Sequence, residues 1–163
     1  MLKHVLVPLD GSKLAEEALE HAIGILAPQG KISLISAVEI PEIPKYGYFT
    51  PVTLPDYENS KSQLLPLAKQ YLEGIVKDFG NADVTFDFSA AIGDPARLII
   101  ETANWLHVDA IVMSTHGRSG ISQLLFGSVT NKVLAAKICP VFVVFNKEVV
   151  PLENATRTVE YVN

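Results

Sequence analysis

The chain has 163 residues, a length that suits one domain with a sizeable hydrophobic core. Apolar residues make up 48% of the chain and charged residues 19%, which indicates a globular protein and excludes a disordered one. The formal net charge of −5 argues against non-specific binding to DNA or RNA, because such binding needs a basic surface. Cys139 is the single cysteine, so the chain forms no intramolecular disulfide and no cysteine zinc cluster.

The N-terminal sequence gives no sign of secretion. Residues 1–7 have the pattern of a strand and lack the apolar region and small-residue cleavage site of a signal peptide. No apolar run approaches the roughly 18 residues that a membrane-spanning helix needs. We therefore expect a cytoplasmic protein that binds neither a membrane nor nucleic acid.

The first predicted elements are a strand, a helix and a second strand. Residues 2–7 predict the first strand, and Ser12 is a suitable N-cap for the helix that follows. The Pro-Gln-Gly segment at 28–30 is expected to end this helix, and residues 31–38 predict the second strand. Residues 40–55 are rich in proline and aromatic residues, which predicts a long loop. This loop is either a functional lid or partner surface, or a plain insertion.

The alternation continues through the middle of the chain. Apolar residues at helical spacing run from 64 to 79, with Pro66 either at the start of the helix or at a kink. Residues 84–90 alternate apolar and polar side chains, which predicts a half-exposed strand at a sheet edge. Asp94 is a suitable N-cap for the next helix, and Pro95 suits its first position.

A fourth strand, a glycine-rich loop, a last helix and a fifth strand complete the pattern. We place the strands at 110–113 and 139–145 and the helix at 129–137. Residues 1–146 are therefore expected to form one domain, followed by a C-terminal tail at 147–163 without clear periodicity.

Strict alternation of strands and helices predicts an α/β fold. We expect a single doubly wound five-stranded parallel sheet in the order 3-2-1-4-5, with helices on both faces. In this order the chain reverses direction between the first and fourth strands, and ligands bind beyond the carboxyl ends of strands at such a reversal. Asp10 follows the first strand and the glycine-rich loop follows the fourth. The topology therefore predicts that Asp10 lies beside the glycines.

The glycine-rich loop at 113–130 is a candidate anion site. Gly117, Gly127 and the N-terminal amides of the last helix suit a phosphate, with Ser128 as the cap. The hydroxyls of Ser128 and Thr130 would add donors. The spacing matches neither the P-loop nor the dinucleotide-binding motif. The alternative is a structural glycine-rich turn in which Ser128 is a simple cap.

Three polar side chains near this predicted site each allow two interpretations. Asp10 accepts hydrogen bonds from ribose hydroxyls or forms an Asx turn. His116 binds phosphate or satisfies a backbone carbonyl, and Arg118 clamps a phosphate or lies in solvent. Cys139 is expected to be inert core inside an apolar strand. No catalytic nucleophile is indicated, and no histidine has the spacing of a metal site.

The fifth strand indicates self-association. Residues 141–145 are continuously apolar, yet the predicted order places them at a sheet edge, where an exposed apolar strand is an aggregation hazard. The same strand of a second copy, from Val141 to Phe145, would cover this edge in a two-fold homodimer. The tail would then contribute by docking on the partner. Alternatively, the tail folds back and covers the edge within one chain.

Taken together, these motifs resemble the universal stress protein family over about residues 1–146. The ATP-binding branch of that family has Gly-x-x-Gly, nine residues, and then Gly-Ser or Gly-Thr. Gly117 and Gly127 fit this spacing, while Ser114 stands where the first glycine would be. The segments that carry the resemblance are residues 5–12 (VLVPLDGS), 93–95 (GDP), 113–120 (MSTHGRSG), 127–129 (GSV) and 139–141 (CPV).

The resemblance implies an adenine nucleotide, ATP or AMP, with any Mg²⁺ held by the phosphates. Asp10 and the backbone at Pro8 and Leu9 would contact ribose and adenine. Ala37 would present its backbone to the adenine edge, and Met113 would pack near the base. The residues expected around the phosphates are Ser114, His116, Gly117, Arg118, Gly127, Ser128 and Val129.

The resemblance also implies a cytoplasmic homodimer that acts in stress responses. We therefore expect a nucleotide-binding regulatory dimer and not a fast enzyme. One alternative is a slow ATPase or phosphotransferase of the adenine nucleotide α-hydrolase-like type. The sequence offers no positioned general base and no carboxylate metal pair for that chemistry. Another alternative is a nucleotide-free protein-interaction module.

Overall fold

The structure is a computed structural model that describes residues 1–39, 57–80, 83–115 and 127–145. The predicted loop at 40–55 and the tail at 147–163 lie outside these residues. The elements, in chain order, are β1 (Leu2–Pro8), α1 (Lys13–Ile25), β2 (Leu26–Val38), α2 (Tyr57–Phe79), β3 (Val84–Ile92), α3 (Pro95–Leu106), β4 (Ala110–Ser114), α4 (Ser128–Ala136) and β5 (Val141–Val144).

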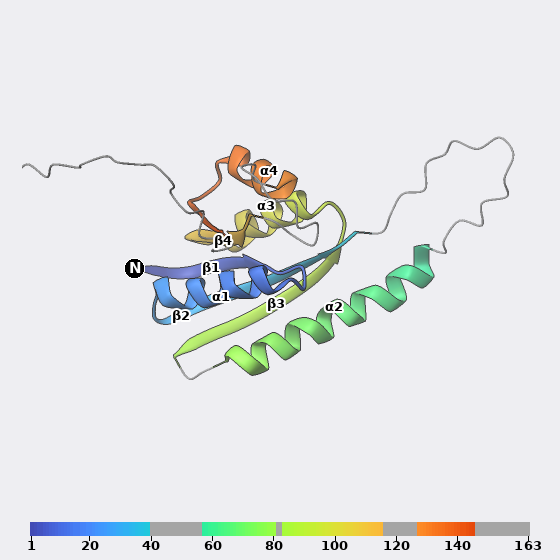
Figure 1. Ribbon diagram of the computed structural model, residues 1–163, viewed down its shortest axis with the longest axis horizontal. Helices are drawn as coiled ribbons and strands as arrows, with labels where there is room; N and C mark the ends of the chain where they lie inside the picture. The colour runs from blue at the N-terminus through green and yellow to red at the C-terminus, as the bar shows by residue number, and fades with distance from the viewer. Residues whose placement is uncertain (40–56, 81–82, 116–126, 146–163) are drawn as a thin grey trace, which may run out of the picture.

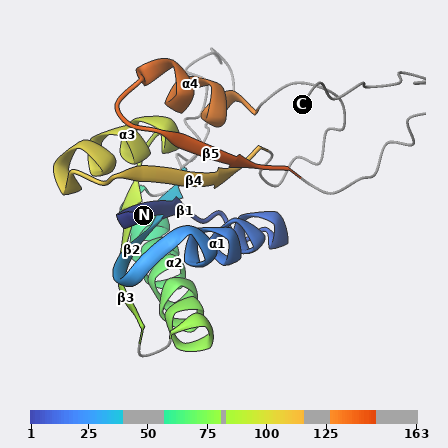
Figure 2. The same ribbon diagram turned by 90° about the vertical axis from the view of Figure 1, so that its left-hand side faces the viewer.

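The five strands form one parallel sheet in the order β3-β2-β1-β4-β5. Helices α1 and α2 cover one face of this sheet, and α3 and α4 lie on the other (Figures 1 and 2). The predicted doubly wound α/β fold and its strand order are therefore confirmed. The direction of winding reverses at the boundary between β1 and β4, as the sequence predicts.

Strand β1 is buried on both faces of the sheet. Val5 and Val7 belong to the core beneath α1 and α2, whereas Leu6 belongs to the core beneath α3 and α4. All three side chains are fully buried, as expected for the central strand of a doubly wound sheet. Each contributes roughly 1.5–3 kcal/mol of hydrophobic stabilisation. The strand that leads to Asp10 is thus fully buried at its centre, in the middle of the sheet.

Local capping signals fix the start of two helices. The Ser12 hydroxyl accepts a hydrogen bond from the Ala15 N–H at 3.2 Å. The Asp94 carboxylate accepts one from the Arg97 N–H at 2.8 Å, and Pro95 occupies the first position of α3. Both caps were predicted from residue type alone, and both are confirmed.

The predicted end of α1 is wrong by several residues. The helix ends at Ile25, and β2 already begins at Leu26 instead of residue 31. Between the pairs Leu2↔Leu26 and His4↔Lys31 the register shifts, because β2 carries extra residues there that include Pro28. Proline lacks an N–H, so it is tolerated where a bulge interrupts the ladder.

Helix α2 runs through Pro66, so the alternative in which this proline starts the helix is wrong. Its C-terminal end at Phe79, just before Gly80, agrees with the sequence pattern. The alternating strand β3 lies at the sheet edge, as predicted.

Candidate functional site

A cavity of about 920 Å³ lies at the carboxyl ends of β1, β2 and β4, where the winding reverses. Residues from α1, from α3, from the first turn of α4 and from the middle of α2 also line it. Every sequence-predicted site residue that the structure describes lines this one cavity: Pro8, Leu9, Asp10, Ala37, Met113, Ser114, Gly127, Ser128 and Val129. The other predicted site residues, His116, Gly117 and Arg118, lie outside the described residues.

Asp10 lies in a tight turn between β1 and α1. Its Oδ1 accepts a hydrogen bond from the Ser12 N–H at 2.9 Å, which is the Asx turn that the sequence allows. Gly11 has a φ of 83°, a left-handed conformation that favours glycine. The Leu9 N–H donates to the Ile35 carbonyl at 2.8 Å and fastens the turn to β2. An ionised carboxylate accepts several hydrogen bonds, so the Asx turn is compatible with a contact to ribose.

The end of β2 extends beyond the end of β1. The last residue pair between these strands is Pro8↔Ile35. The Ile35 carbonyl points toward β1, because it accepts from Leu9, whereas the Val38 carbonyl accepts from Gly93 beside β3 at 3.1 Å. Backbone groups of alternate residues in a parallel strand face opposite neighbours. The N–H and C=O of Ala37 therefore face the same side as those of Ile35, into the space beyond β1.

The start of α4 is held against the end of β4. The Gly127 N–H donates to the Thr115 carbonyl at 2.8 Å, and the Gly127 carbonyl accepts from Asn131 at 3.0 Å. A Cβ at Gly127 would lie 2.7 Å from the Thr115 oxygen, so only glycine fits this approach. The first-turn N–H groups of α4, at Ser128 and Val129, lie along the cavity, where they favour an anion.

Two predicted roles in this region need correction. Ser128 was expected to cap α4, but it is the first helical residue, and Gly127 is the N-cap without a side-chain hydrogen bond. Thr130 was expected to donate to a phosphate. Its buried hydroxyl instead donates to the Ser114 carbonyl at 3.2 Å, which ties α4 to β4. Both errors arise because the sequence does not show how closely the strand end approaches the helix.

The apolar part of the cavity comes from both sides of the sheet. Met113, buried at the end of β4, and Ile35 form one side. Helix α2 contributes Leu64 and Leu67, and Leu67 remains 59% exposed. The α2 residues were not predicted as site residues, because their helical spacing indicates only an apolar face.

Tyr71 of α2 also lines the cavity and was missed by the sequence interpretation. Its hydroxyl donates a hydrogen bond to Glu16 Oε1 at 3.1 Å. Burial raises the pKa of Tyr71 far above its usual value, and the hydrogen bond to Glu16 raises the pKa further. A hydrogen bond with the Gly11 backbone lowers it by less. The hydroxyl thus stays protonated and connects α2 with the first turn of α1.

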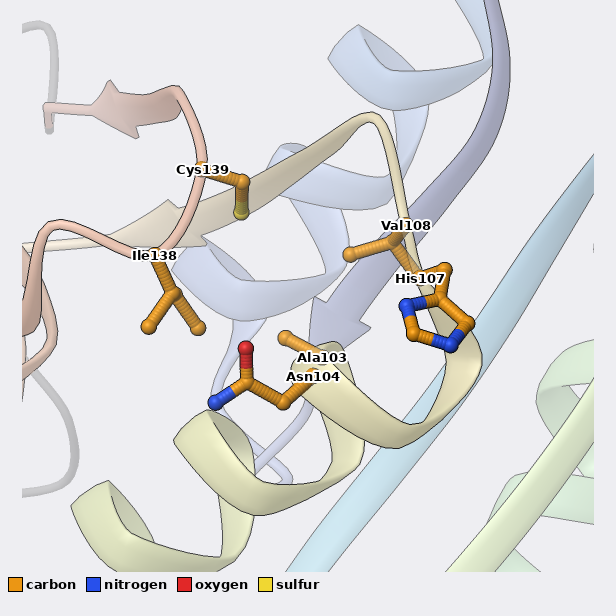
Figure 3. Close-up of a pocket in the computed structure, with 6 residues that line it drawn as sticks. All are labelled: Ala103, Asn104, His107, Val108, Ile138 and Cys139. Atoms are coloured by element: carbon orange, nitrogen blue, oxygen red, sulfur yellow. The ribbon is translucent and has the colours of Figure 1, made fainter.

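A smaller pocket of about 230 Å³ lies near the opposite end of β4 (Figure 3). Cys139 lies there, half-buried and two residues before β5 begins, not inside the strand as predicted. Burial raises the pKa of its thiol, which keeps it protonated and weakly nucleophilic. The residues around this pocket are Ala103, Asn104, His107, Val108, Ile138 and Cys139.

The part of the chain that the structure describes contains neither a grouped metal site nor a helix suited to a membrane. Among residues 1–39, 57–80, 83–115 and 127–145, no three or more His, Cys, Asp or Glu side chains are grouped to hold a metal ion. In the same part of the chain, no helix combines the length and apolarity needed to cross a membrane.

Comparison with known proteins identifies the relatives of this chain. Universal stress protein MJ0577 of Methanocaldococcus jannaschii is 29% identical over 157 residues, which cover 90% of this chain and 97% of the relative. The solved structure of MJ0577 has a TM-score of 0.76 to this structure at 28% identity, and covers 90% and 97% of the two chains.

Two more distant structures share the fold and contain an adenine nucleotide. A universal stress protein in complex with cAMP has a TM-score of 0.57 at 21% identity, covering 88% of this chain and 96% of its own. A universal stress protein family protein from Arabidopsis thaliana with AMP bound also has a TM-score of 0.57, at 16% identity, covering 93% and 97%. The sequence model of the universal stress protein family matches residues 1–144. The chain therefore belongs to the universal stress protein family.

Proposed function

We propose that this protein binds an adenine nucleotide, ATP or AMP, in the cavity at the carboxyl ends of β1, β2 and β4. In this proposal residues 1–146 are the nucleotide-binding domain of a cytoplasmic stress-response regulator. The observation that carries the proposal is the convergence of Asp10, Ala37, Met113 and Gly127, from four separate elements or turns, on one cavity. Two structures with this fold contain AMP and cAMP, which supports an adenine nucleotide as the ligand.

The base would lie between the end of β2 and β4. Adenine has apolar faces and, on one edge, an acceptor nitrogen beside a donor amino group. The N–H and C=O of Ala37 offer the complementary donor and acceptor at the strand end. Met113 and Ile35 provide the apolar contact for the ring. These contacts bind and orient the base without any charged side chain.

The phosphates would lie at the start of α4. The first-turn N–H groups and the Ser128 hydroxyl are donors there, and the absence of a side chain at Gly127 leaves the backbone accessible. One exposed helix N-terminus contributes only about 0.3–1 kcal/mol toward an anion, so several donors must act together. Mg²⁺, if bound with ATP, would be held by the phosphate oxygens, because the described residues include no acidic cluster for it.

We also propose that the protein is a homodimer in which two copies of β5 meet. Phe142 and Phe145, in and just after this edge strand, are 44% and 58% exposed. Pairing with a second β5 would cover these rings and satisfy the free edge of the strand.

The first experiment identifies the bound molecule. The purified chain is denatured, and any released small molecule is identified by mass spectrometry. Calorimetry then measures the affinities for ATP and AMP, with GTP as the control nucleotide. We expect adenine nucleotides to bind and GTP to bind more weakly. No released nucleotide and no binding heat with ATP or AMP would contradict the proposal and favour a nucleotide-free interaction module.

A matched pair of variants tests the site. Asp10→Asn should weaken ATP binding by roughly 10- to 100-fold, the range expected for losing a hydrogen bond to a charged group. Asp78→Asn makes the same change of charge on an exposed residue of α2 outside the cavity, and should leave affinity unchanged. Equal affinities of the two variants would show that Asp10 does not contact the nucleotide. Steady formation of ADP at ordinary enzyme rates would instead identify an ATPase.

A further inference from the structure

Ser36, near the end of β2, is a buried polar residue whose hydroxyl has no hydrogen-bond partner among the residues that the structure describes. Its exposed fraction is only 7%. Other buried hydroxyls in the same part of the chain are paired: Ser33 bonds to His4 at 2.8 Å, and Thr130 donates to a backbone carbonyl at 3.2 Å. A buried hydroxyl without a partner loses its hydration and gains nothing in return. The site therefore favours a ligand that supplies the missing partner.

The Ser36 hydroxyl faces the cavity. Side chains alternate between the two faces of a strand. Leu34 belongs to the core beneath α1 and α2, and Ile35 belongs to the opposite core, so Ser36 points to the α1 and α2 side. Ser36 lines the cavity, and no side-chain polar atom of the described residues is both fully enclosed and unpaired. Because its hydroxyl is unpaired, the Ser36 oxygen must be accessible from the cavity.

Helix α2 supplies an apolar wall on the same side of the sheet. Its apolar stripe is buried where it covers the strands, at Leu72 and Ile75. The N-terminal part of α2 extends past the carboxyl ends of β2 and β3 (Figure 1). There Leu64, Leu67 and Ala68 continue the stripe and line the cavity, and Leu67 is 59% exposed. This part of the stripe lacks the cover that the sheet gives to the rest.

A hydroxyl donor beside an apolar wall suits a flat ring that carries an acceptor nitrogen. Adenine has apolar faces and several ring nitrogens that accept hydrogen bonds. In the proposed site the Ala37 backbone binds one edge of the base, and Met113 contacts one face. The second face and the other ring nitrogens are then left without a partner. Ser36 directly precedes Ala37, so its hydroxyl lies beside the same base.

We propose that the Ser36 hydroxyl donates a hydrogen bond to a ring nitrogen of the bound adenine, and that Leu67 covers the face of the ring on the α2 side. This inference rests on the proposed function, because it requires an adenine nucleotide in the cavity. A hydrogen bond depends on one ring atom, whereas an apolar contact depends on the area of the ring. The two residues therefore respond differently when single nitrogens of the base are replaced.

Ser36→Ala tests the hydrogen bond with four ligands, whose affinities calorimetry measures. They are ATP and its 1-deaza, 3-deaza and 7-deaza analogues, in which a C–H group replaces one ring nitrogen. We expect the variant to weaken ATP binding by about 3- to 10-fold, the effect of one hydrogen bond. For the analogue that lacks the contacted nitrogen, the loss should stay within about 2-fold, because the substitution then removes no contact.

Leu67→Ala tests the apolar contact with the same ligands. We expect it to weaken the binding of all four by about 3- to 10-fold and by similar factors, because each ring has the same face. Leu67 is largely exposed in the free protein, so its truncation should leave the stability to urea nearly unchanged.

Ser33→Ala is the matched control on the same strand. Ser33 is also buried, but its hydroxyl is paired with His4, and it does not line the cavity. Ser33→Ala should lower the stability to urea and leave all four affinities unchanged. Ser36→Ala should do the reverse, because removing an unpaired hydroxyl breaks no hydrogen bond in the free protein. A merely structural role of Ser36 would not produce this reversal.

The outcomes that overturn the inference differ from failure of the proposed function. Equal losses of Ser36→Ala for ATP and all three analogues would show that the hydroxyl contacts no ring nitrogen. No loss in Ser36→Ala, with a clear loss in Asp10→Asn, would overturn the inference and leave the nucleotide site intact. A wild-type chain that binds none of the four ligands would overturn the proposed function and the inference together.

Discussion

Gly127 is the residue on which the phosphate side of the proposed nucleotide site most depends. Its φ of −54° is accessible to any residue, so its conformation does not require glycine. The requirement is one of space, because an added Cβ would lie 2.7 Å from the Thr115 carbonyl oxygen. The contact between β4 and α4 is therefore what a larger residue would disturb first.

Gly127→Ala should destabilise the fold by about 1–3 kcal/mol, because backbone atoms must shift to relieve the contact. Gly74→Ala is the matched control: Gly74 lies inside α2 with open space around its Cα. Alanine there should stabilise the protein by roughly 0.5–1 kcal/mol through its helix propensity. Urea unfolding measures both free energies, and equal effects of the two substitutions would contradict this account.

His4 is a second residue whose surroundings predict a measurable effect. Its Nε2 lies 2.8 Å from the Ser33 hydroxyl. Burial lowers the pKa of His4 below its usual 6.5, and the charge of Lys31 lowers it further. Asp87 and Asp109 raise it by less. The folded state therefore binds the proton more weakly than the unfolded chain.

The sign of the pH dependence follows from this difference. Above about pH 6.5 the imidazole is neutral in both states, and this contribution to stability is complete. As the pH falls below that value the unfolded chain takes up the proton first, so the free energy of unfolding decreases until the lower folded pKa is reached. His4→Gln should flatten this slope in urea unfolding between about pH 7 and pH 5. An unchanged slope would contradict the assignment to His4.

The carboxylates act in a separate pH range. The pKa of Asp94 is lowered by hydrogen bonds from the Arg97 N–H and Lys132, and that of Asp109 by the N–H groups of His4 and Lys3. Their stabilisation is present above their usual value of 3.8 and is lost as the pH falls through the lower folded values. The His4 effect is therefore measured without interference from them.

At the scale of elements, sequence periodicity predicted all the helices and strands that the structure describes, but not all of their ends. Ser12 and Asp94 were predictable because an N-cap depends on residues within one turn. The start of β2 was not, because Pro28 is tolerated only through the register shift against β1. The course of α2 through Pro66 was left open as well, because a proline in a helical pattern fits either the start of a helix or a position inside it.

The same distinction applies to the candidate site. Strand order alone brought Asp10 together with Gly127, because parallel strands place their carboxyl ends at one edge. The contribution of α2 was missed, because a helix that packs on a sheet and a helix that lines a cavity have the same apolar sequence pattern. Tyr71 could not be found from sequence because its hydrogen-bond partner, Glu16, is distant in the chain.

At the scale of the whole molecule, the sheet has two unlike edges. Strand β3 at one edge is long and alternates apolar with polar side chains, which suits contact with water on one face. Strand β5 at the other edge is short and continuously apolar. Val141 and Val144 pack against the two cores, whereas Phe142 is 44% exposed. A surface ring on an edge strand is the feature that a second copy of the chain would cover.

Phe142→Glu should therefore convert the proposed dimer into a monomer, as measured by sedimentation velocity. A two-fold contact places the residue and its copy near each other, so the substitution introduces two like charges into one interface. Phe142 is a better target than the half-buried Val143, where a charge would also disturb folding.

Trp105→Glu provides the control for this substitution. Trp105 lies on α3, outside β5, and is 80% exposed, so the same change from an aromatic ring to a carboxylate should leave the mass unchanged. Circular dichroism checks that both variants are folded. A monomeric wild-type chain would contradict the dimer, and a Phe142→Glu variant that stays dimeric would place the contact elsewhere. If only the Phe142 variant dissociates, the apolar β5 edge of the sheet is the dimer interface. Burial in that interface then accounts for the exposed ring of Phe142.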